Sequence, residues 1–83
     1  MAQIEIRVQA YGAVERLLPQ QLSIFCDVSS AISEVLSQVQ QVFPDAEQAI
    51  ERCACAIGED IVLRQTRLYR DTQLVLLSPV AGG

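Results

Sequence analysis

The residues most able to do chemistry lie in the C-terminal sequence LVLLSPVAGG. An apolar, strand-like run passes through Pro79 into Ala81 and two glycines, Gly82 and Gly83. Proline fixes its own φ and keeps the preceding Ser78 extended, so the glycines are expected to project from a rigid base. Glycine has no side chain, and such a tail can enter a narrow channel where a Cβ atom would clash. The reactive group that it would deliver is the α-carboxylate of Gly83.

This carboxylate would need help from another protein. A carboxylate is a poor electrophile until it is activated, and the sequence contains no nucleotide-binding loop. The chain has no histidine, so it lacks the commonest general base and the commonest metal ligand. The sequence therefore predicts a chain whose reaction at Gly83 is catalysed by an outside enzyme.

Three cysteines are the remaining candidates for chemistry. Cys53 and Cys55 are two residues apart and would share one face of a strand, as a thiol pair or as two metal ligands. Zinc sites usually have four ligands at wider spacings, and free cysteine is among the most buried residue types. We therefore interpret both residues as small buried hydrophobic side chains and expect no metal site. The odd count, completed by Cys26, and the lack of a recognisable signal peptide favour a reducing cytoplasm.

Composition limits the possible partners. The chain has 83 residues, 51% of them hydrophobic and 19% charged, with a net charge of −4. These values are typical of one folded domain. The six basic residues are all arginine, and an acidic chain has little with which to neutralise a row of phosphates. No apolar run approaches 18 residues. Neither nucleic acid nor a membrane is expected as a partner.

Periodicity predicts two strands followed by a helix. Apolar and polar residues alternate over residues 4–11 and 22–28, which is typical of half-buried strands, and the connection 12–21 has room for about one helical turn. The spacing then changes to that of an α-helix. Ser29 or Ser30 is expected to cap this helix, and Pro44 to end it. Its apolar stripe consists of Ile32, Val35, Leu36, Val39, Val42 and Phe43.

The rest of the chain predicts shorter elements. Residues 45–53 can form one or two further helical turns, residues 58–60 a turn and residues 65–72 mostly loop. Strands are expected at 53–57, 61–64 and 73–80. This order predicts an α+β fold in which one main helix packs across one face of a mixed sheet. With the last strand beside the first, it is a β-grasp arrangement. The expected domain is 1–78, followed by a flexible tail at 79–83.

The last strand is apolar on both faces. Leu74 and Leu76 lie on one face, and Val75 and Leu77 on the other. One helix can cover only one face of the sheet. Loops could cover the second face, or it could be an exposed apolar patch to which another protein binds.

Several stretches of the sequence resemble one family. The ending PVAGG, the AVERLL segment and the AIGEDIV segment resemble the small subunit of molybdopterin synthase, a ubiquitin-like sulfur carrier whose members end in Pro-Pro-Val-Ser-Gly-Gly or a close variant. The resemblance extends over nearly the whole chain and is most specific in the tail. Ser78 replaces the first proline, Gly58 stands where the family prefers asparagine, and RDTQL replaces a turn rich in aspartate and glycine.

The resemblance implies a role for the tail. An E1-like adenylating enzyme would use ATP to activate Gly83, and a sulfur donor enzyme would convert it to a thiocarboxylate. The tail, made of Pro79, Val80, Ala81 and Gly82, would then enter the large subunit of a heterotetramer. There the sulfur would attack a cyclic pterin. The chain would be a non-catalytic carrier with no bound cofactor.

The resemblance also implies a docking surface. It places Tyr11 and Ile61 near Leu77, so these residues and Val75 are expected to bind the large subunit.

Other functions stay open. A thiocarboxylate at the same position could serve thiamine or cysteine synthesis, although the length and the Pro-Val before the tail favour molybdopterin. A protein modifier would instead form an isopeptide bond through Gly83, but a chain without lysine cannot build lysine-linked polymers of itself. The remaining alternative is a binding domain with no such chemistry.

Overall fold

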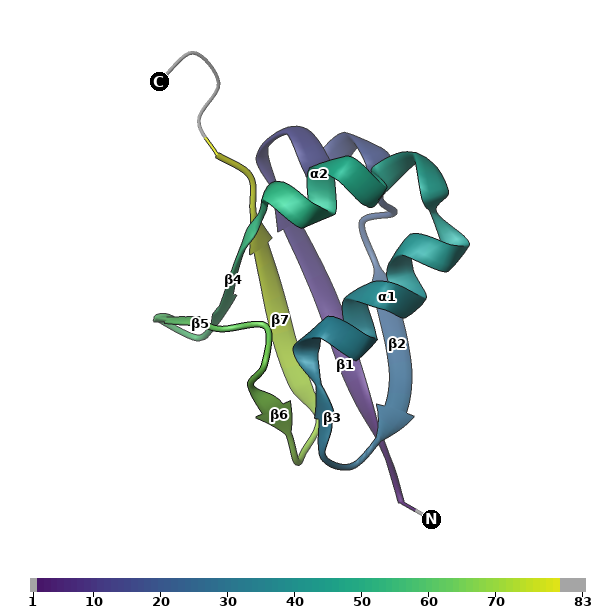
Figure 1. Ribbon diagram of the computed structural model, residues 1–83, viewed down its shortest axis with the longest axis vertical. Helices are drawn as coiled ribbons and strands as arrows, with labels where there is room; N and C mark the ends of the chain where they lie inside the picture. Colours follow the sequence, from purple (N-terminus) through teal and green to yellow (C-terminus); the bar gives the residue numbers. More distant parts are fainter. Residues whose placement is uncertain (1, 80–83) are drawn as a thin grey trace.

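The computed structural model describes residues 2–79, which form a sheet with helices packed against one side (Figure 1). The five-stranded sheet has the order β2-β1-β7-β4-β5, and a separate two-stranded ribbon pairs β3 with β6. The strands are β1 (Gln3–Tyr11), β2 (Leu22–Asp27), β3 (Ser30–Ala31), β4 (Ala54–Ile57), β5 (Asp60–Val62), β6 (Arg67–Leu68) and β7 (Thr72–Leu77). The α-helices are α1 (Ile32–Val42) and α2 (Glu47–Arg52), and the 3-10 helices are η1 (Gly12–Leu17) and η2 (Pro44–Ala46).

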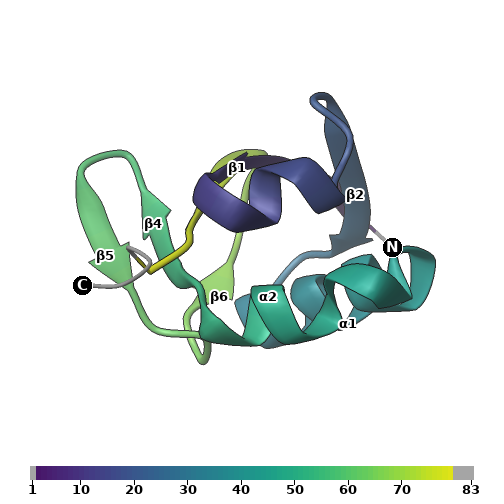
Figure 2. The ribbon, with the colours of Figure 1, turned by 90° about the horizontal axis from the view of Figure 1, so that it is seen from above.

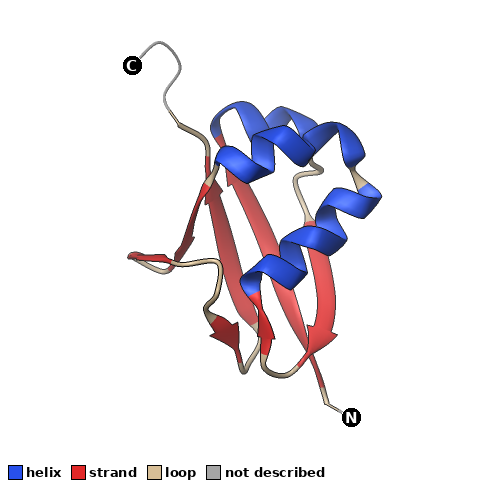
Figure 3. Ribbon diagram, viewed as in Figure 1, coloured by secondary structure: helices blue, strands red, loops and turns tan. Residues whose placement is uncertain are grey.

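The central strands confirm the predicted topology. β1 pairs antiparallel with β2 as a hairpin and parallel with β7, so the last strand lies beside the first. β4 pairs antiparallel with both β7 and β5, which makes the sheet mixed. Helices α1 and α2 lie on the same side of this sheet (Figures 2 and 3). We call the other side the open face.

The core lies between the sheet and the helices. In β7, Leu74 and Leu76 are fully buried, and Val8 and Ala10 of β1, which pair with them, are buried too. Burying one such side chain stabilises the fold by about 1.5–3 kcal/mol. From α1 the core receives Ile32, Val35, Leu36 and Val39.

Two residues expected in the core are exposed instead. Val42 is the last residue of α1 and is 64% exposed, because the helix ends before Pro44 and the chain continues as η2. Phe43 packs only partly against the core. Val28 is also exposed, because β2 ends at Asp27 and the alternation no longer applies beyond it. Pro44 ends α1 as predicted.

The predicted serine cap of α1 is wrong. The residue that precedes the helix is Ala31, and neither Ser29 nor Ser30 caps it with a side-chain hydrogen bond. The first backbone N–H groups of the helix bond instead to a segment far along the chain. The N–H of Ile32 donates to the carbonyl of Thr66 at 2.9 Å, and that of Ser33 donates to Arg64 at 2.9 Å. A tertiary contact thus satisfies the donors that a local cap would have taken.

The boundaries of the later strands also differ from the predictions. β5 ends at Val62, so Arg64 is free to bond elsewhere. The expected loop 65–72 contains β6, which pairs with β3. β7 ends at Leu77, and Ser78 and Pro79 follow it. Within the part of the chain that the structure describes, no helix is long and apolar enough to cross a membrane.

Candidate functional site

The tail itself falls largely outside the described residues. Val80, Ala81, Gly82 and Gly83 are not among them, so their expected roles stay predictions. Pro79 is described and exposed. The described part of the site is therefore the end of β7 and the surface around it.

Strand register brings the four predicted surface residues to one region of the open face. Tyr11 of β1 lies directly beside Leu77 of β7. One step further along β7, Val75 pairs with Ala56 of β4, which in turn pairs with Ile61 of β5. Directly paired residues point to the same side of a sheet. The four predicted residues come from three strands, β1, β5 and β7, and are up to 66 positions apart in the sequence.

The exposed fractions of these side chains show whether loops cover this face or leave an apolar patch open to solvent. Tyr11 is 50% exposed and Ile61 is 66% exposed, so loops do not cover them. Val75 and Leu77 are half-buried between their neighbours. We call Tyr11, Ile61, Val75 and Leu77 the apolar patch.

Two alanines of β4 that the strand patterns did not point to lie among the patch residues. Ala54 is exposed and pairs with Leu77, and Ala56 is buried between Val75 and Ile61. Only Ala54 therefore adds to the surface of the patch. Predicting them required the register of β4 against β7, because alanine gives no signal of its own in a strand pattern.

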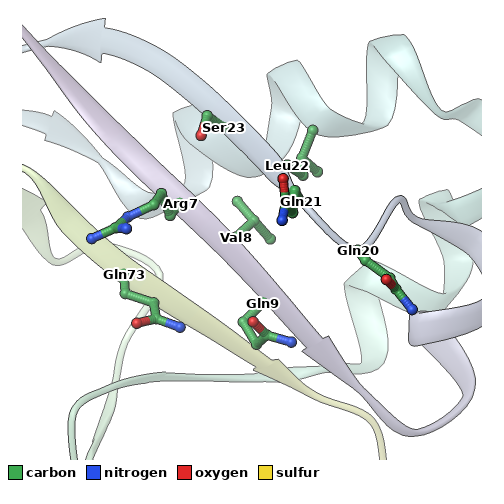
Figure 4. Close-up of a pocket in the computed structure, with 8 residues that line it drawn as sticks. All are labelled: Arg7, Val8, Gln9, Gln20, Gln21, Leu22, Ser23 and Gln73. Atoms are coloured by element: carbon green, nitrogen blue, oxygen red, sulfur yellow. The ribbon is translucent and has the colours of Figure 1, made fainter.

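The other part of the open face is polar. A shallow pocket of about 390 Å³ lies over β1, β2 and β7 near the start of β2. Figure 4 shows Arg7 and Gln9 from β1 beside Gln73 from β7, with Ser23 and the two glutamines that precede β2 around them. The open face thus has an apolar part next to the end of β7 and a polar part beyond it.

Ser78 lies where the chain leaves the sheet, and the structure gives it several contacts. Its N–H donates to the carbonyl of Tyr11 at 3.1 Å. Its Oγ accepts a hydrogen bond from the N–H of Val14 at 3.0 Å, and the Sγ of Cys53 lies 3.7 Å from the same oxygen. None of these contacts is visible in the sequence, where Ser78 is marked only as the residue that Pro79 keeps extended.

Arg64 stabilises the junction between α2 and β4, next to the strand that pairs with the end of β7. Its Nη2 donates to the carbonyl oxygens of Ile50 at 2.7 Å, Cys53 at 2.9 Å and Glu51 at 3.2 Å. These carbonyls lie at the C-terminal end of α2, where a cation is favourable. This anchor holds the chain just before Ala54, which pairs with Leu77 in the apolar patch.

The cysteines are buried in the core, as predicted. Cys26, Cys53 and Cys55 are free thiols, and all three are buried. Cys53 precedes β4 rather than lying in it, and its thiol donates to the carbonyl of Ala49 at 3.1 Å. Among residues 2–79, no group of three or more cysteine or acidic side chains could hold a metal ion.

We expect these thiols to react slowly in the folded protein. Burial raises the pKa of the Cys26 thiol and of the Cys55 thiol, and only the thiolate is a good nucleophile. A disulfide reagent at neutral pH should label the native chain far more slowly than the unfolded chain. Because a raised folded-state pKa favours the neutral thiol, the free energy of unfolding should fall as the pH rises above the ordinary thiol pKa of about 8.5. Rapid labelling of native protein would contradict the burial.

Comparison with known proteins supports the fold. No family model matches the sequence, and no curated protein matches it. Among solved structures, SAMP1 from Haloferax volcanii has a TM-score of 0.83 at 11% identity, covering 95% of this chain and 99% of that one. A putative molybdopterin converting factor, subunit 1, from Pyrococcus furiosus has a TM-score of 0.80 at 9% identity, covering 93% and 99%.

A third similar chain comes from a complex of subunits 1 and 2 of the molybdopterin-converting factor from Helicobacter pylori 26695. Its TM-score is 0.61 at 20% identity, and the match covers 96% of this chain and 100% of that one. The fold is the ubiquitin-like β-grasp. In this β-grasp, β7 carries the chain past the apolar patch and out of the sheet at Ser78.

Proposed function

We propose that this chain is the sulfur-carrying small subunit of a molybdopterin synthase, with the large subunit bound to the apolar patch. The observation that carries the proposal is the position of the patch. Leu77 belongs to the patch and is only two residues from Pro79, where the tail begins. A partner that covers the patch therefore holds the start of the tail against its own surface. The β-grasp fold, similar to that of a subunit 1 of a molybdopterin converting factor, supports this function.

In the proposed cycle the chain carries sulfur and its partners supply the catalysis. The Gly83 carboxylate attacks the α-phosphate of ATP on an E1-like activating enzyme, and pyrophosphate leaves. A sulfide equivalent from a sulfur donor enzyme displaces AMP and leaves a thiocarboxylate. In the large subunit the thiocarboxylate sulfur attacks a cyclic pterin, and water later returns the carboxylate. ATP is bound by the activating enzyme, and this chain binds no cofactor.

The number of carriers in the complex follows from the product of the reaction. Molybdopterin carries a dithiolene, a group with two sulfur atoms, and each carrier delivers one of them. We therefore propose a heterotetramer of two carriers and two large subunits in the cytoplasm.

A second candidate is a protein modifier. The fold similarity to SAMP1, whose full name is small archaeal modifier protein 1, favours it. In that function Gly83 would form an isopeptide bond with a lysine of a target protein. A thiocarboxylate that serves thiamine or cysteine synthesis is a further variant of the carrier function.

Intact mass spectrometry separates the two candidates. After co-expression with a cognate activating enzyme and sulfur donor, a fraction of the protein should gain the mass of one sulfur-for-oxygen exchange. Fragmentation should place the change on Gly83. Protein that forms lysine conjugates and never a thiocarboxylate would favour the modifier instead.

A further inference from the structure

We propose that Ser78 is a positioning residue, whose hydroxyl fixes the direction in which the C-terminal tail leaves the sheet. The role in transfer rests on the proposed function, but the structural role does not. Ser78 is the residue after β7, and its N–H extends the contact between β1 and β7 by one bond to Tyr11. This backbone bond leaves the side-chain rotamer of Ser78 unfixed, and Pro79 restricts the backbone of Ser78 only to the broad extended region.

The hydroxyl of Ser78 removes that freedom by capping η1. Helix starts have N–H groups without helical partners, and a serine just before the helix usually satisfies one of them. The residue in that position is Tyr11, which makes no side-chain cap. Ser78 takes its place from the far end of the chain, since its Oγ accepts the hydrogen bond of Val14, a fully buried residue.

Gly12 shows how closely the two segments meet. A Cβ atom built on Gly12 would lie 2.7 Å from the Cβ of Ser78, a separation that real atoms do not adopt. Gly12 also has φ +85°, which side-chain-bearing residues rarely adopt. On the other side of Ser78 lies the thiol of Cys53. The side chain thus contacts both η1 and Cys53, the residue before β4.

The hydrogen bond supplies a constraint that the backbone of Ser78 lacks. Pro79 limits its own φ by its ring, whereas Ser78 has no ring and its φ is free. The hydrogen bond from Val14 limits it. A proline at 78 would instead lose the N–H that bonds to Tyr11. The tail's start is therefore fixed by a tertiary contact, and the rate of transfer depends on it because small misplacements of a reacting group are costly.

The first test measures the tail's direction in the isolated protein. Leu63 is exposed and follows β5 at the same end of the sheet as Ser78, so a nitroxide on Leu63→Cys reports on the tail. The native thiols are buried and should label slowly. Ser78→Ala should change the paramagnetic broadening of the Gly82 and Gly83 amides by about twofold or more, and Ser78→Thr should restore it. Unchanged broadening in Ser78→Ala would overturn the proposal.

The second test measures transfer with the assembled synthase. At saturating large subunit, Ser78→Ala should slow single-turnover sulfur transfer by about tenfold or more, with a change of less than about twofold in the half-saturating concentration. Gly12→Ala keeps the hydroxyl of Ser78 but adds a Cβ atom that would clash with the Ser78 side chain. This variant should also slow sulfur transfer.

Ser23→Ala is the matched control for both tests, because it also removes one side-chain hydrogen bond, to Glu5, from a strand. A rate that falls equally in this control, or that stays unchanged while the broadening changes, would overturn the positioning role. A wild-type protein that transfers no sulfur would refute the proposed function, and the broadening alone would then decide whether Ser78 directs the tail.

Discussion

Deleting Gly83 should abolish sulfur transfer to the pterin precursor and leave the stability of the protein unchanged. The deletion removes the carboxylate that would be activated and shortens the tail by one residue. The core lies between the sheet and α1, and β7 ends at Leu77, so residues beyond Pro79 are not needed to bury it. The free energy of unfolding should stay within about 0.5 kcal/mol of wild type, as for other surface changes. A reconstituted transfer assay and thermal unfolding measure the two effects.

Two further variants separate the carboxylate from the shape of the tail. A chain extended past Gly83 keeps the glycines but masks the carboxylate. Gly82→Val keeps the carboxylate but adds a β-branched side chain that restricts the backbone and widens the tail. Both should be inactive and stable. Gly58→Asn is the matched control, because this glycine has φ +61° in the turn after β4, at the opposite end of that strand from the partner of Leu77, and asparagine tolerates that conformation. Activity in the extended variant, with proteolytic trimming excluded, would falsify the role of the free carboxylate.

Leu77→Asp should weaken binding of the large subunit by well over tenfold. Leu77 lies on the open face between Tyr11 and Ala54, and covering such a side chain contributes about 1.5–3 kcal/mol to a complex. A carboxylate there would be buried without a partner in the complex, which adds to the loss. In the free protein the substituted side chain can reach water, so the monomer should stay folded. Titration calorimetry measures the binding, and circular dichroism checks the fold.

Phe25→Asp is the matched control for Leu77→Asp. Phe25 is 59% exposed on β2 and lies opposite Glu5, beyond the polar part of the open face. The same substitution there should leave the affinity for the large subunit nearly unchanged. Equal weakening by both variants would mean that the interface is not centred on the apolar patch. Unfolding of Leu77→Asp would assign Leu77 to the core.

The pattern of apolar residues in the sequence was enough to predict the elements that form the core. Alternation in β1 and the helical spacing in α1 arise because a half-buried element must place its apolar residues on one side. These patterns are local, and burial follows from them directly. They predicted buried side chains such as Ile6 and Val35, whereas β7 is apolar on both faces and its pattern did not say that Leu74 and Leu76 would be the buried pair. They became unreliable where an element ended, as at Val28 and Val42.

The composition of the tail was also visible in the sequence, and its resemblance to a sulfur carrier suggested the chemistry. The register of the strands was not visible. Tyr11, Val75 and Ile61 share a surface only because β1, β7, β4 and β5 pair in one particular alignment. Each strand pattern would look the same with its neighbours shifted by two residues, so the alignment is decided by packing of the whole sheet.

Contacts between distant segments were decided by the tertiary structure alone. Local rules assigned the cap of α1 to Ser29 or Ser30, but the carbonyls of Arg64 and Thr66 accept those bonds. The residue before η1, Tyr11, makes no side-chain cap, and Ser78 supplies one from 64 residues away. A hydrogen-bond donor must be satisfied once it is buried, but it does not matter where along the chain its acceptor comes from. The sequence therefore determined which groups needed partners, and the folded sheet determined which partners they found.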